Sequence, residues 1–379
     1  MKIIVLGAGL VGGPMAIDLA AEPGFRVTAA DIDGAALARL SQIAGLRAIR
    51  MDLSSPDNVR RLVADYDYVL SAVPGYLGFQ TLDAIISAGK NVVDISFFSE
   101  DPFDLDSRAR RIGITAAVDC GVAPGMSNVL AGYAESLLDT MDSLLIYVGG
   151  LPEKHDWPYD YKAGFSPMDV IEEYLRPARF VQDGALIVRP ALSDPELIDF
   201  PEVGTLEAFN TDGLRTLIRT ISAPNMKEKT LRYPGHIEKI AILREIGLLD
   251  KTEIQVGGVP VRPLDVTAHL LFPKWKMLET DRDITVMKIV VEGKRDGDPW
   301  RYAWDLLDRH DPATRTHSMA RTTGYTATVA LRMLARGLFT GHGIIAPKFF
   351  GRRPECVRFL LDGLRERGVC YRETDGRIP

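Results

Sequence analysis

Cysteine is scarce in this 379-residue sequence, long basic runs are absent, and no apolar stretch reaches the length of a membrane span. Cys120, Cys356 and Cys370 show no metal-ligand spacing and cannot all pair, which favours a reducing cytoplasm. The net charge of −6 argues against nucleic acid as a main partner. A first strand expected from Met1 leaves no room for a signal peptide. We therefore expect a cytoplasmic protein without nucleic-acid or membrane partners.

The histidines also lack a recognisable metal pattern. No two are four residues apart, as the histidines of a helix-borne zinc site are. The six stand at positions His155, His236, His269, His310, His317 and His342. From this spacing we expect no metal site.

The first 31 residues have the pattern of a phosphate-binding turn. The apolar run Met1–Leu6 is followed by Gly7, Gly9 and Gly12 in G-x-G-x-x-G spacing at the start of a helical segment. These glycines allow a tight turn, a close approach of a pyrophosphate to the backbone, and close packing of helix on strand. We expect this turn to bind a dinucleotide through Gly7, Gly9, Leu10, Val11 and Gly12.

An acidic residue stands where a ribose-binding carboxylate is expected. Asp31 ends a second β-rich run, 19 positions after Gly12. A carboxylate there accepts hydrogen bonds from ribose hydroxyls and repels a 2′-phosphate, and neither Ile32 nor the two residues that follow it supply a cation. The pattern predicts contacts of Asp31 and Ile32 with the cofactor and favours NAD over NADP.

Six apolar runs alternate with amphipathic segments over the first 122 residues: MKIIVL, FRVTAA, LRAIRM, DYVLSAV, NVVDIS and ITAAVD. This alternation predicts a Rossmann-type, doubly wound parallel sheet, in which ligands bind beyond the carboxyl ends of the strands. Strand ends therefore supply further predicted cofactor contacts, which are Asp52, Ala72, Val73, Pro74 and Asp119. For Asp52, helix capping is an equally good alternative.

The middle of the chain has a different pattern. SLLIYVGG is typical of a strand, and two Asp-Gly dipeptides, at Asp183 and Asp296, lie between β-rich runs as in antiparallel hairpins. Helical patterns cover 213–221 and 236–249. We expect a second α+β domain for substrate binding and dimerisation, with a mixed or antiparallel sheet.

The end of the chain is helical again, at 319–336 and 355–367, with apolar faces that need a sheet to cover. We expect these helices to return to the cofactor domain. The predicted domains are thus 1–125 together with about 312–379, which bind NAD, and 126–311. At the junction of the two, Cys120 is expected to be a packing residue, because no histidine is near it in sequence.

Several longer motifs resemble one protein family over nearly the whole chain. They are GAGLVGG with Asp31, the loop CGVAPGMSN, and the segments FSPMDVIEEYLRPA, GTLEAFNTDGLRTL and KTLRYPGHIEKI. They resemble the saccharopine dehydrogenase family and, within it, most of all the lysine 6-dehydrogenases. The resemblance implies an NAD- or NADP-linked oxidoreductase that acts at a carbon–nitrogen bond of an amino acid, and a homodimer or higher homo-oligomer.

The resemblance also indicates substrate-binding residues. Arg232 lies in the family's TLRY motif, and a guanidinium can hold a carboxylate through two parallel bonds, although a structural ion pair is the alternative. In the segment Asn210-Thr211-Asp212, Thr211 stands where saccharopine reductases have an arginine, which favours a substrate with a single carboxylate. Asn128 could orient the substrate amine or the cofactor, or close a helix terminus.

Oxidation of an amine by hydride transfer needs a base. His236, at the start of a predicted helix, is one candidate, because the helix dipole lowers the pKa of an imidazole; a capping role is equally good. Glu207 and Asp212 flank Asn210 and could hold the substrate ammonium, or could be solvated. An aromatic-rich segment around His155 could form a lid or a surface loop.

Three functions remain open. The first is oxidation of the side-chain amine of L-lysine with NAD, giving 2-aminoadipate 6-semialdehyde and ammonia. The second is a saccharopine reductase-like or other imine-reducing dehydrogenase, against which Asp31 and Thr211 count. The third is a non-catalytic NAD-binding regulatory module, which would be favoured if Arg232 lay far from the carboxyl ends of the cofactor strands.

Overall fold

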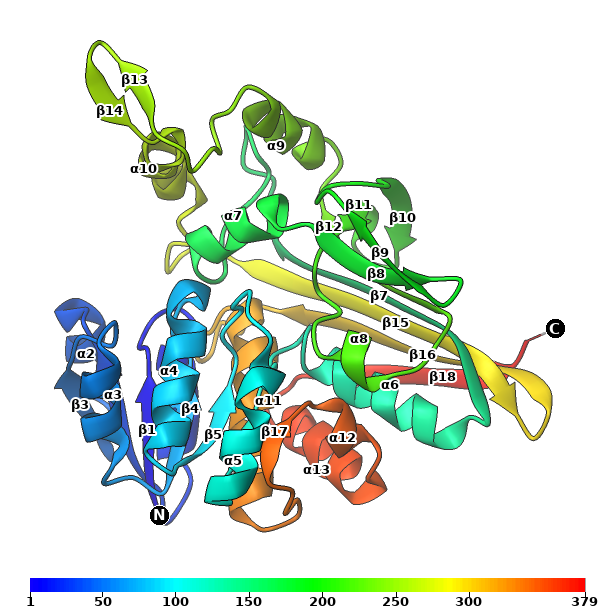
Figure 1. Cartoon of the computed structure of the whole chain (residues 1–379), viewed down its shortest axis with the longest axis horizontal. Helices are drawn as coiled ribbons and strands as arrows, with labels where there is room; N and C mark the ends of the chain where they lie inside the picture. The colour runs from blue at the N-terminus through cyan, green and yellow to red at the C-terminus, as the bar shows by residue number, and fades with distance from the viewer. Residues whose placement is uncertain (379) are drawn as a thin grey trace.

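The computed structural model describes residues 1–378 and contains two large sheets. In Figure 1 the N-terminal sheet and its helices lie below a long, tilted second sheet. The first sheet has the order β17-β6-β5-β4-β1-β2-β3, and all its pairings are parallel. This confirms the doubly wound parallel sheet that the sequence predicts.

All six predicted strands of this sheet are present: β1 (Lys2–Leu6), β2 (Arg26–Asp31), β3 (Leu46–Arg50), β4 (Tyr68–Ser71), β5 (Asn91–Asp94) and β6 (Thr115–Ala117). The helices between them are α1 (Gly12–Ala20), α2 (Gly34–Leu40), α3 (Pro56–Val63), α4 (Gly75–Ser87) and α5 (Asp106–Ile112), the last preceded by the 3-10 turn η1 (Pro102–Leu105). Ile3 and Val5 of β1 belong to one core and Ile4 and Leu6 to another. A strand buried on both faces needs this continuous apolar run.

The second sheet has nine strands and is mixed. Its strands are β7 (Thr140–Pro152), β8 (Ala178–Gln182), β9 (Ala185–Arg189), β10 (Glu196–Phe200), β11 (Gly204–Asn210), β12 (Asn225–Arg232), β15 (Asp283–Arg295), β16 (Asp298–Arg309) and β18 (Tyr371–Arg377). Strand β12 runs parallel to β7, and the other pairs are antiparallel. The hairpins β8–β9 and β15–β16 turn at the two Asp-Gly dipeptides, as predicted.

Helices and one small hairpin accompany this sheet. They are α6 (Met126–Leu137), α7 (Pro167–Leu175), α8 (Leu217–Thr220), α9 (His236–Glu245), α10 (Pro263–Trp275) and the projecting pair β13 (Ile254–Val256) and β14 (Val259–Val261), visible at the top of Figure 1. The helical pattern over 213–221 is wrong except for the short α8. Arg215 has a φ of 50°, in the left-handed region, so the chain turns there instead of forming helix.

The C-terminal part of the chain contributes one strand to each of the two large sheets. Helix α11 (Ser318–Ala335) packs on α1, where Arg332 pairs with Asp18 at 2.7 Å, and β17 (Gly343–Ile345) joins β6. After α12 (Lys348–Gly351) and α13 (Pro354–Arg365), β18 pairs with β16 of the second sheet. The segment 312–379 therefore does not lie wholly in the cofactor domain. No helix within residues 1–378 is long and apolar enough to cross a membrane.

Candidate active site

One cavity of about 710 Å³ joins the two sheets. Its walls combine the carboxyl ends of the first sheet's strands with β7, β12 and α7 of the second region. Of the residues predicted as contacts, those that line it are Gly7, Gly9, Leu10, Val11, Gly12, Asp31, Ile32, Asp52, Ala72, Val73, Pro74, Thr211 and Arg232. The glycine turn and Arg232 thus share one cavity, which weighs against the non-catalytic module.

The glycine turn has the geometry that its sequence predicts. A Cβ on Gly12 would lie 2.2 Å from the carbonyl oxygen of Gly7, and one on Gly7, whose φ is +97°, would lie 2.5 Å from that of Ala72. A Cβ on Gly9 would meet nothing within 4 Å, because Gly9 faces the cavity. No side chain caps the N-terminus of α1. Its backbone N–H groups are therefore available to phosphate oxygens.

Asp31 both orders this turn and faces the cavity. Its Oδ2 accepts a hydrogen bond from the backbone nitrogen of Ala8 at 2.6 Å, and its Oδ1 accepts one from that of Asp33 at 2.8 Å. Each carboxylate oxygen keeps a second lone pair for a ribose hydroxyl. A cation is nearer than the sequence suggests, since Nε of Arg50 on the neighbouring strand donates to the carbonyl of Ile32 at 3.1 Å. Arg50 is distant from Asp31 in sequence, and the pairing of β3 with β2 brings the two residues side by side. The sequence alone therefore did not indicate this cation.

Asp52 lines the cavity and does not cap the following helix. Its Oδ1 accepts bonds from the backbone nitrogen and the hydroxyl of Ser54, and the hydroxyl hydrogen bond is the larger cause of the lowered pKa of Asp52. Ser55 is the residue that caps α3. The capping alternative is therefore wrong, and a cofactor contact remains a prediction.

Arg232 is the one arginine, lysine or histidine among the cavity-lining residues within 1–378. Its Nε donates to Tyr174 Oη at 3.1 Å, its Nη1 to its neighbour's carbonyl at 2.9 Å, and its Nη2 to Oε2 of Glu173 at 2.9 Å. These bonds use three of the five guanidinium N–H groups. One N–H remains on each terminal nitrogen and is available to a carboxylate.

Three carboxyl groups that the sequence interpretation missed line the same cavity as Arg232: those of Asp169, Glu173 and Glu228. Burial is the largest cause in each case, raising the pKa of Asp169 to about 6, that of Glu228 to about 8, and that of Glu173 above its usual range. Glu228 is only 4% exposed. A carboxyl with a pKa near 8 can accept and release a proton near neutral pH.

The spacing of these residues contained a usable signal. Glu228, Thr230 and Arg232 alternate along β12 and all line the cavity, as residues two apart on a strand share a face. Asp169 and Glu173 are four apart on α7 and share a helix face. Given Arg232 in the cavity, the strand period predicts Glu228 there, and the helix period predicts that Asp169 and Glu173 lie on one face of α7.

Glu228 is held tightly. Thr211 Oγ1 donates to its Oε2 at 2.5 Å, and the hydroxyls of Thr211 and Thr230 lie 2.8 Å apart. A Cβ on Gly213 would lie 2.2 Å from the carboxyl carbon of Glu228. Glycine at 213 therefore leaves room for the carboxyl group.

His236, one of the predicted candidates for the base, does not line the cavity. Its Nδ1–H donates to the carbonyl of Tyr159 at 2.8 Å, so that its Nε2 accepts from Tyr174 Oη at 2.9 Å. Burial, followed by the charge of Arg232, lowers the pKa of His236 to about 3. Both nitrogens are occupied, so the prediction of a base is corrected: His236 orients Tyr174, which accepts from Arg232.

The other polar predictions also lie outside the cavity lining. Asp212 forms two 2.8 Å bonds with Arg179, and Glu207 accepts from the backbone nitrogen of Gly235 at 3.1 Å. Asn210 donates to Asp194 at 2.8 Å. These groups stabilise loops around the site, and none of the three faces the space where a substrate would lie.

Asp119 and Asn128, which were predicted to contact the cofactor or the substrate, form hydrogen bonds at the junction of the two domains instead. Asp119 pairs with Arg215 at 3.2 Å, with both side chains buried. Asn128 accepts from the backbone nitrogen of Gly125 at 3.3 Å and donates to Thr216 Oγ1 at 3.2 Å. Neither lines the cavity, so Asn128 has the helix-terminal role, and Asp119 connects the domains.

Family models match both halves of the chain. The model described as "Saccharopine dehydrogenase NADP binding domain" matches residues 3–117, and that described as "Saccharopine dehydrogenase C-terminal domain" matches residues 121–369.

Sequence and structure comparisons with individual proteins are consistent with these family matches. The chain is 26% identical over 294 residues to mouse (Mus musculus) mitochondrial alpha-aminoadipic semialdehyde synthase, covering 74% of this chain and 31% of the relative, so it spans about a third of that protein's length. It is 21% identical to carboxyaminopropylagmatine dehydrogenase of Synechocystis, covering 100% of this chain and 99% of the relative. An apo structure of saccharopine dehydrogenase (L-Glu forming) from Saccharomyces cerevisiae matches with a TM-score of 0.79 at 21% identity, covering 99% of both chains, which shows the same fold.

Proposed function

The chain belongs to the saccharopine dehydrogenase family of oxidoreductases, and on this premise we propose that it oxidises the side-chain amine of L-lysine with NAD. The ammonium nitrogen gives up a proton to the protein, and the carbon that bears it gives up a hydride to the dinucleotide. Water adds to the resulting imine, and the loss of ammonia then yields 2-aminoadipate 6-semialdehyde. The observation that carries this proposal is the charge of the cavity, where one guanidinium stands among several carboxyls.

The balance of charge fits lysine better than a substrate with several carboxylates. Lysine carries one carboxylate and two ammonium groups, whereas saccharopine carries three carboxylates. Arg232 offers two free N–H groups to one carboxylate, and Asp169, Glu173 and Glu228 can face ammonium groups. More carboxylates would meet like charges with no further lysine or arginine in the lining within residues 1–378.

The first sheet fits a dinucleotide. The glycine turn and the uncapped N-terminus of α1 would bind the pyrophosphate, and Asp31 would bind ribose hydroxyls. When bound, the dinucleotide accepts the hydride. The carboxylate of Asp31 supports NAD over NADP, although Arg50 lies close enough to be tested as a partner for a 2′-phosphate.

Glu228 is the group we assign to proton transfer. The substrate ammonium must lose a proton before its carbon can give up a hydride, and an ionised carboxyl in the cavity wall can take that proton. Its raised pKa, near 8, makes it a stronger base than a solvated glutamate. The hydrogen bond from Thr211 holds one carboxyl oxygen, so that the other can face the substrate.

Steady-state assays test the proposal directly. With L-lysine and NAD, we expect NADH to form, with lower activity on ornithine and none on saccharopine. Ammonia release, measured in the same reaction, separates deamination from other oxidations. Absence of NADH with every primary amine tested would overturn the proposal.

A second candidate is reduction of an imine formed from an amine and an aldehyde. The full-length similarity to the Synechocystis relative favours it, because that protein's name describes a secondary amine carrying a guanidine. The same carboxyls could bind a guanidinium or ammonium arm. Oxidation of NADH or NADPH in the presence of an amine and an aldehyde, without reaction of L-lysine in the other direction, would favour this candidate. A cytoplasmic location and a homo-oligomer remain predictions.

A further inference from the structure

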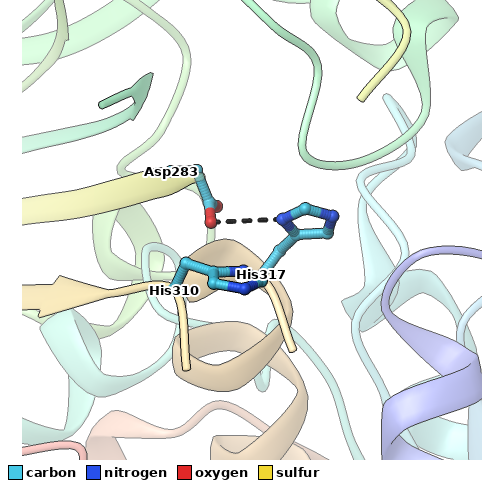
Figure 2. A group of neighbouring side chains, drawn as sticks. All are labelled: Asp283, His310 and His317. Atoms are coloured by element: carbon cyan, nitrogen blue, oxygen red, sulfur yellow. Dashed lines mark ion pairs between the residues drawn. The ribbon is translucent and has the colours of Figure 1, made fainter. Parts of the chain in front are cut away.

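A second group of chemistry-bearing side chains lies outside the cavity lining. Asp283 begins β15, His310 follows β16, and His317 precedes α11 (Figure 2). The backbone nitrogen of His310 donates to the carbonyl of Asp283 at 2.9 Å. Asp311 and Thr316 form two backbone hydrogen bonds, of 2.9 and 3.2 Å, that close the intervening loop. This closure brings together two histidines that are seven positions apart in sequence.

The three side chains are arranged as metal ligands would be. One ligand atom from each lies within 4.8 Å of the others. Oδ1 of Asp283 and Nδ1 of His317 are 3.4 Å apart, joined by the dashed line in Figure 2. Two ligands about 2.1 Å from a tetrahedral zinc ion are roughly 3.4 Å apart. That pair already has the required spacing.

One ring nitrogen of each of the two histidines makes no hydrogen bond among the described residues. Nδ1 of His310 and Nδ1 of His317 are shielded from solvent and have no hydrogen-bond partner within residues 1–378. A buried polar atom without a partner costs about 1–3 kcal/mol. An ion would satisfy both nitrogens at once.

The surrounding charges permit a cation. Arg321, on the adjoining helix, pairs with Asp308 at 3.1 Å and with Asp311 at 3.4 Å, so its charge is balanced locally. Asp283 accepts from the backbone nitrogens of Ser318 at 2.7 Å and Met319 at 3.0 Å. Each oxygen still has a lone pair for an ion.

We propose that Asp283, His310 and His317 bind one Zn²⁺ ion, with water as the fourth ligand. Two imidazoles and one carboxylate are a ligand set that zinc accepts, and one that calcium and magnesium, which take oxygen ligands, do not. None of the three residues lines the large cavity, so the ion would not contact a substrate bound there. The ion would tie the start of α11 to β15 and β16. Because Met319 and Thr323 of α11 line the cavity, the ion would also steady that wall.

Metal titration of the full-length protein tests this. After treatment with a chelator and dialysis, we expect ZnCl₂ to bind with one ion per chain in calorimetry and to raise Tm by about 3 °C or more at 100 times Kd. Co²⁺ at the same site should give the intense visible bands of a tetrahedral ion. His310→Gln and His317→Gln should each weaken Zn²⁺ binding at least about 100-fold. His269→Gln, which changes an exposed histidine elsewhere, should bind as the unchanged protein does.

Two results would overturn the site. One is Zn²⁺ binding by His310→Gln and His317→Gln that equals that of the His269→Gln control. The other is the weak Co²⁺ spectrum of a six-coordinate ion in the unchanged protein, a result that does not depend on how the variants fold. Circular dichroism and NADH fluorescence establish that each variant is folded before titration.

Discussion

Nη2 of Arg232 donates to Oε2 of Glu173 across 2.9 Å in the wall of the cavity that joins the two sheets. The carboxylate compensates the buried guanidinium and fixes its plane, while two N–H groups remain for a substrate. This pair explains how a nearly buried arginine can serve as an anchor.

Arg232→Lys is expected to raise KM for L-lysine about 10- to 100-fold, because an ammonium keeps the charge and loses the two parallel bonds. 1,5-Diaminopentane has the same amine and no carboxylate, so its KM should change much less. The comparison of the two substrates is the measurement. Equal losses on both would mean that Arg232 supports the fold and does not bind the carboxylate.

Glu228→Gln is expected to lower kcat about 10²- to 10⁴-fold, the usual contribution of a general base. Because burial raises the pKa of Glu228 to about 8, kcat/KM of the unchanged enzyme should rise with pH up to about 8. The variant should lose this dependence. Glu207→Gln is the matched control, since Glu207 lies outside the cavity lining and glutamine can still accept from Gly235. A larger loss in Glu207→Gln would reverse the assignment.

Gly213→Ala is expected to displace the carboxyl of Glu228, because the added Cβ would lie 2.2 Å from its carboxyl carbon. Activity should fall at least about tenfold, while the Kd for NADH, measured by fluorescence, stays unchanged. Gly376→Ala serves as the control, because a Cβ there would meet nothing within 4 Å. Full activity of Gly213→Ala would mean that Glu228 does not depend on this contact.

His236 is expected to influence the acid sensitivity of the fold. Its folded pKa of about 3 lies below the ordinary value of 6.5, so between these values the unfolded chain binds more protons. Its contribution to stability is present above about pH 6.5 and is lost as pH falls toward 3. His236→Gln should therefore show a smaller fall in Tm from pH 7 to pH 5 than the unchanged protein. A parallel fall in both would contradict a buried, neutral imidazole.

Asp31→Ser is expected to lower kcat/KM for NAD about tenfold and to increase the relative use of NADP, because the group that repels a 2′-phosphate is gone. Asp33→Ser is the control, since serine also caps helices and Asp33 caps α2. The ratio of kcat/KM for the two cofactors is the readout. No change in that ratio would mean that Asp31 only orders the glycine turn.

The sequence by itself determined the first sheet and the half of the site that binds the dinucleotide. Gly7, Gly12 and Asp31 are close in sequence, and a strand, a turn and a helix in succession can form only a few arrangements. The two Asp-Gly dipeptides between β-rich runs similarly predicted the hairpins of the second sheet, because such dipeptides favour the tight turns that join antiparallel strands.

Only the tertiary structure decided the substrate half and the grouping of Asp283, His310 and His317. Which face of β12 carries Glu228 into the cavity depends on the pairing of β12 with β7 and β11, and sequence periodicity does not specify that pairing. His236 has the sequence context of a base, yet the packing of Tyr159 and Tyr174 occupies both its nitrogens. Spacing along the chain gave no reason to group these histidines, whereas strand pairing and loop closure bring His310 and His317 to Asp283. Local patterns reflect local geometry, and a site assembled from distant segments exists only after the chain has packed.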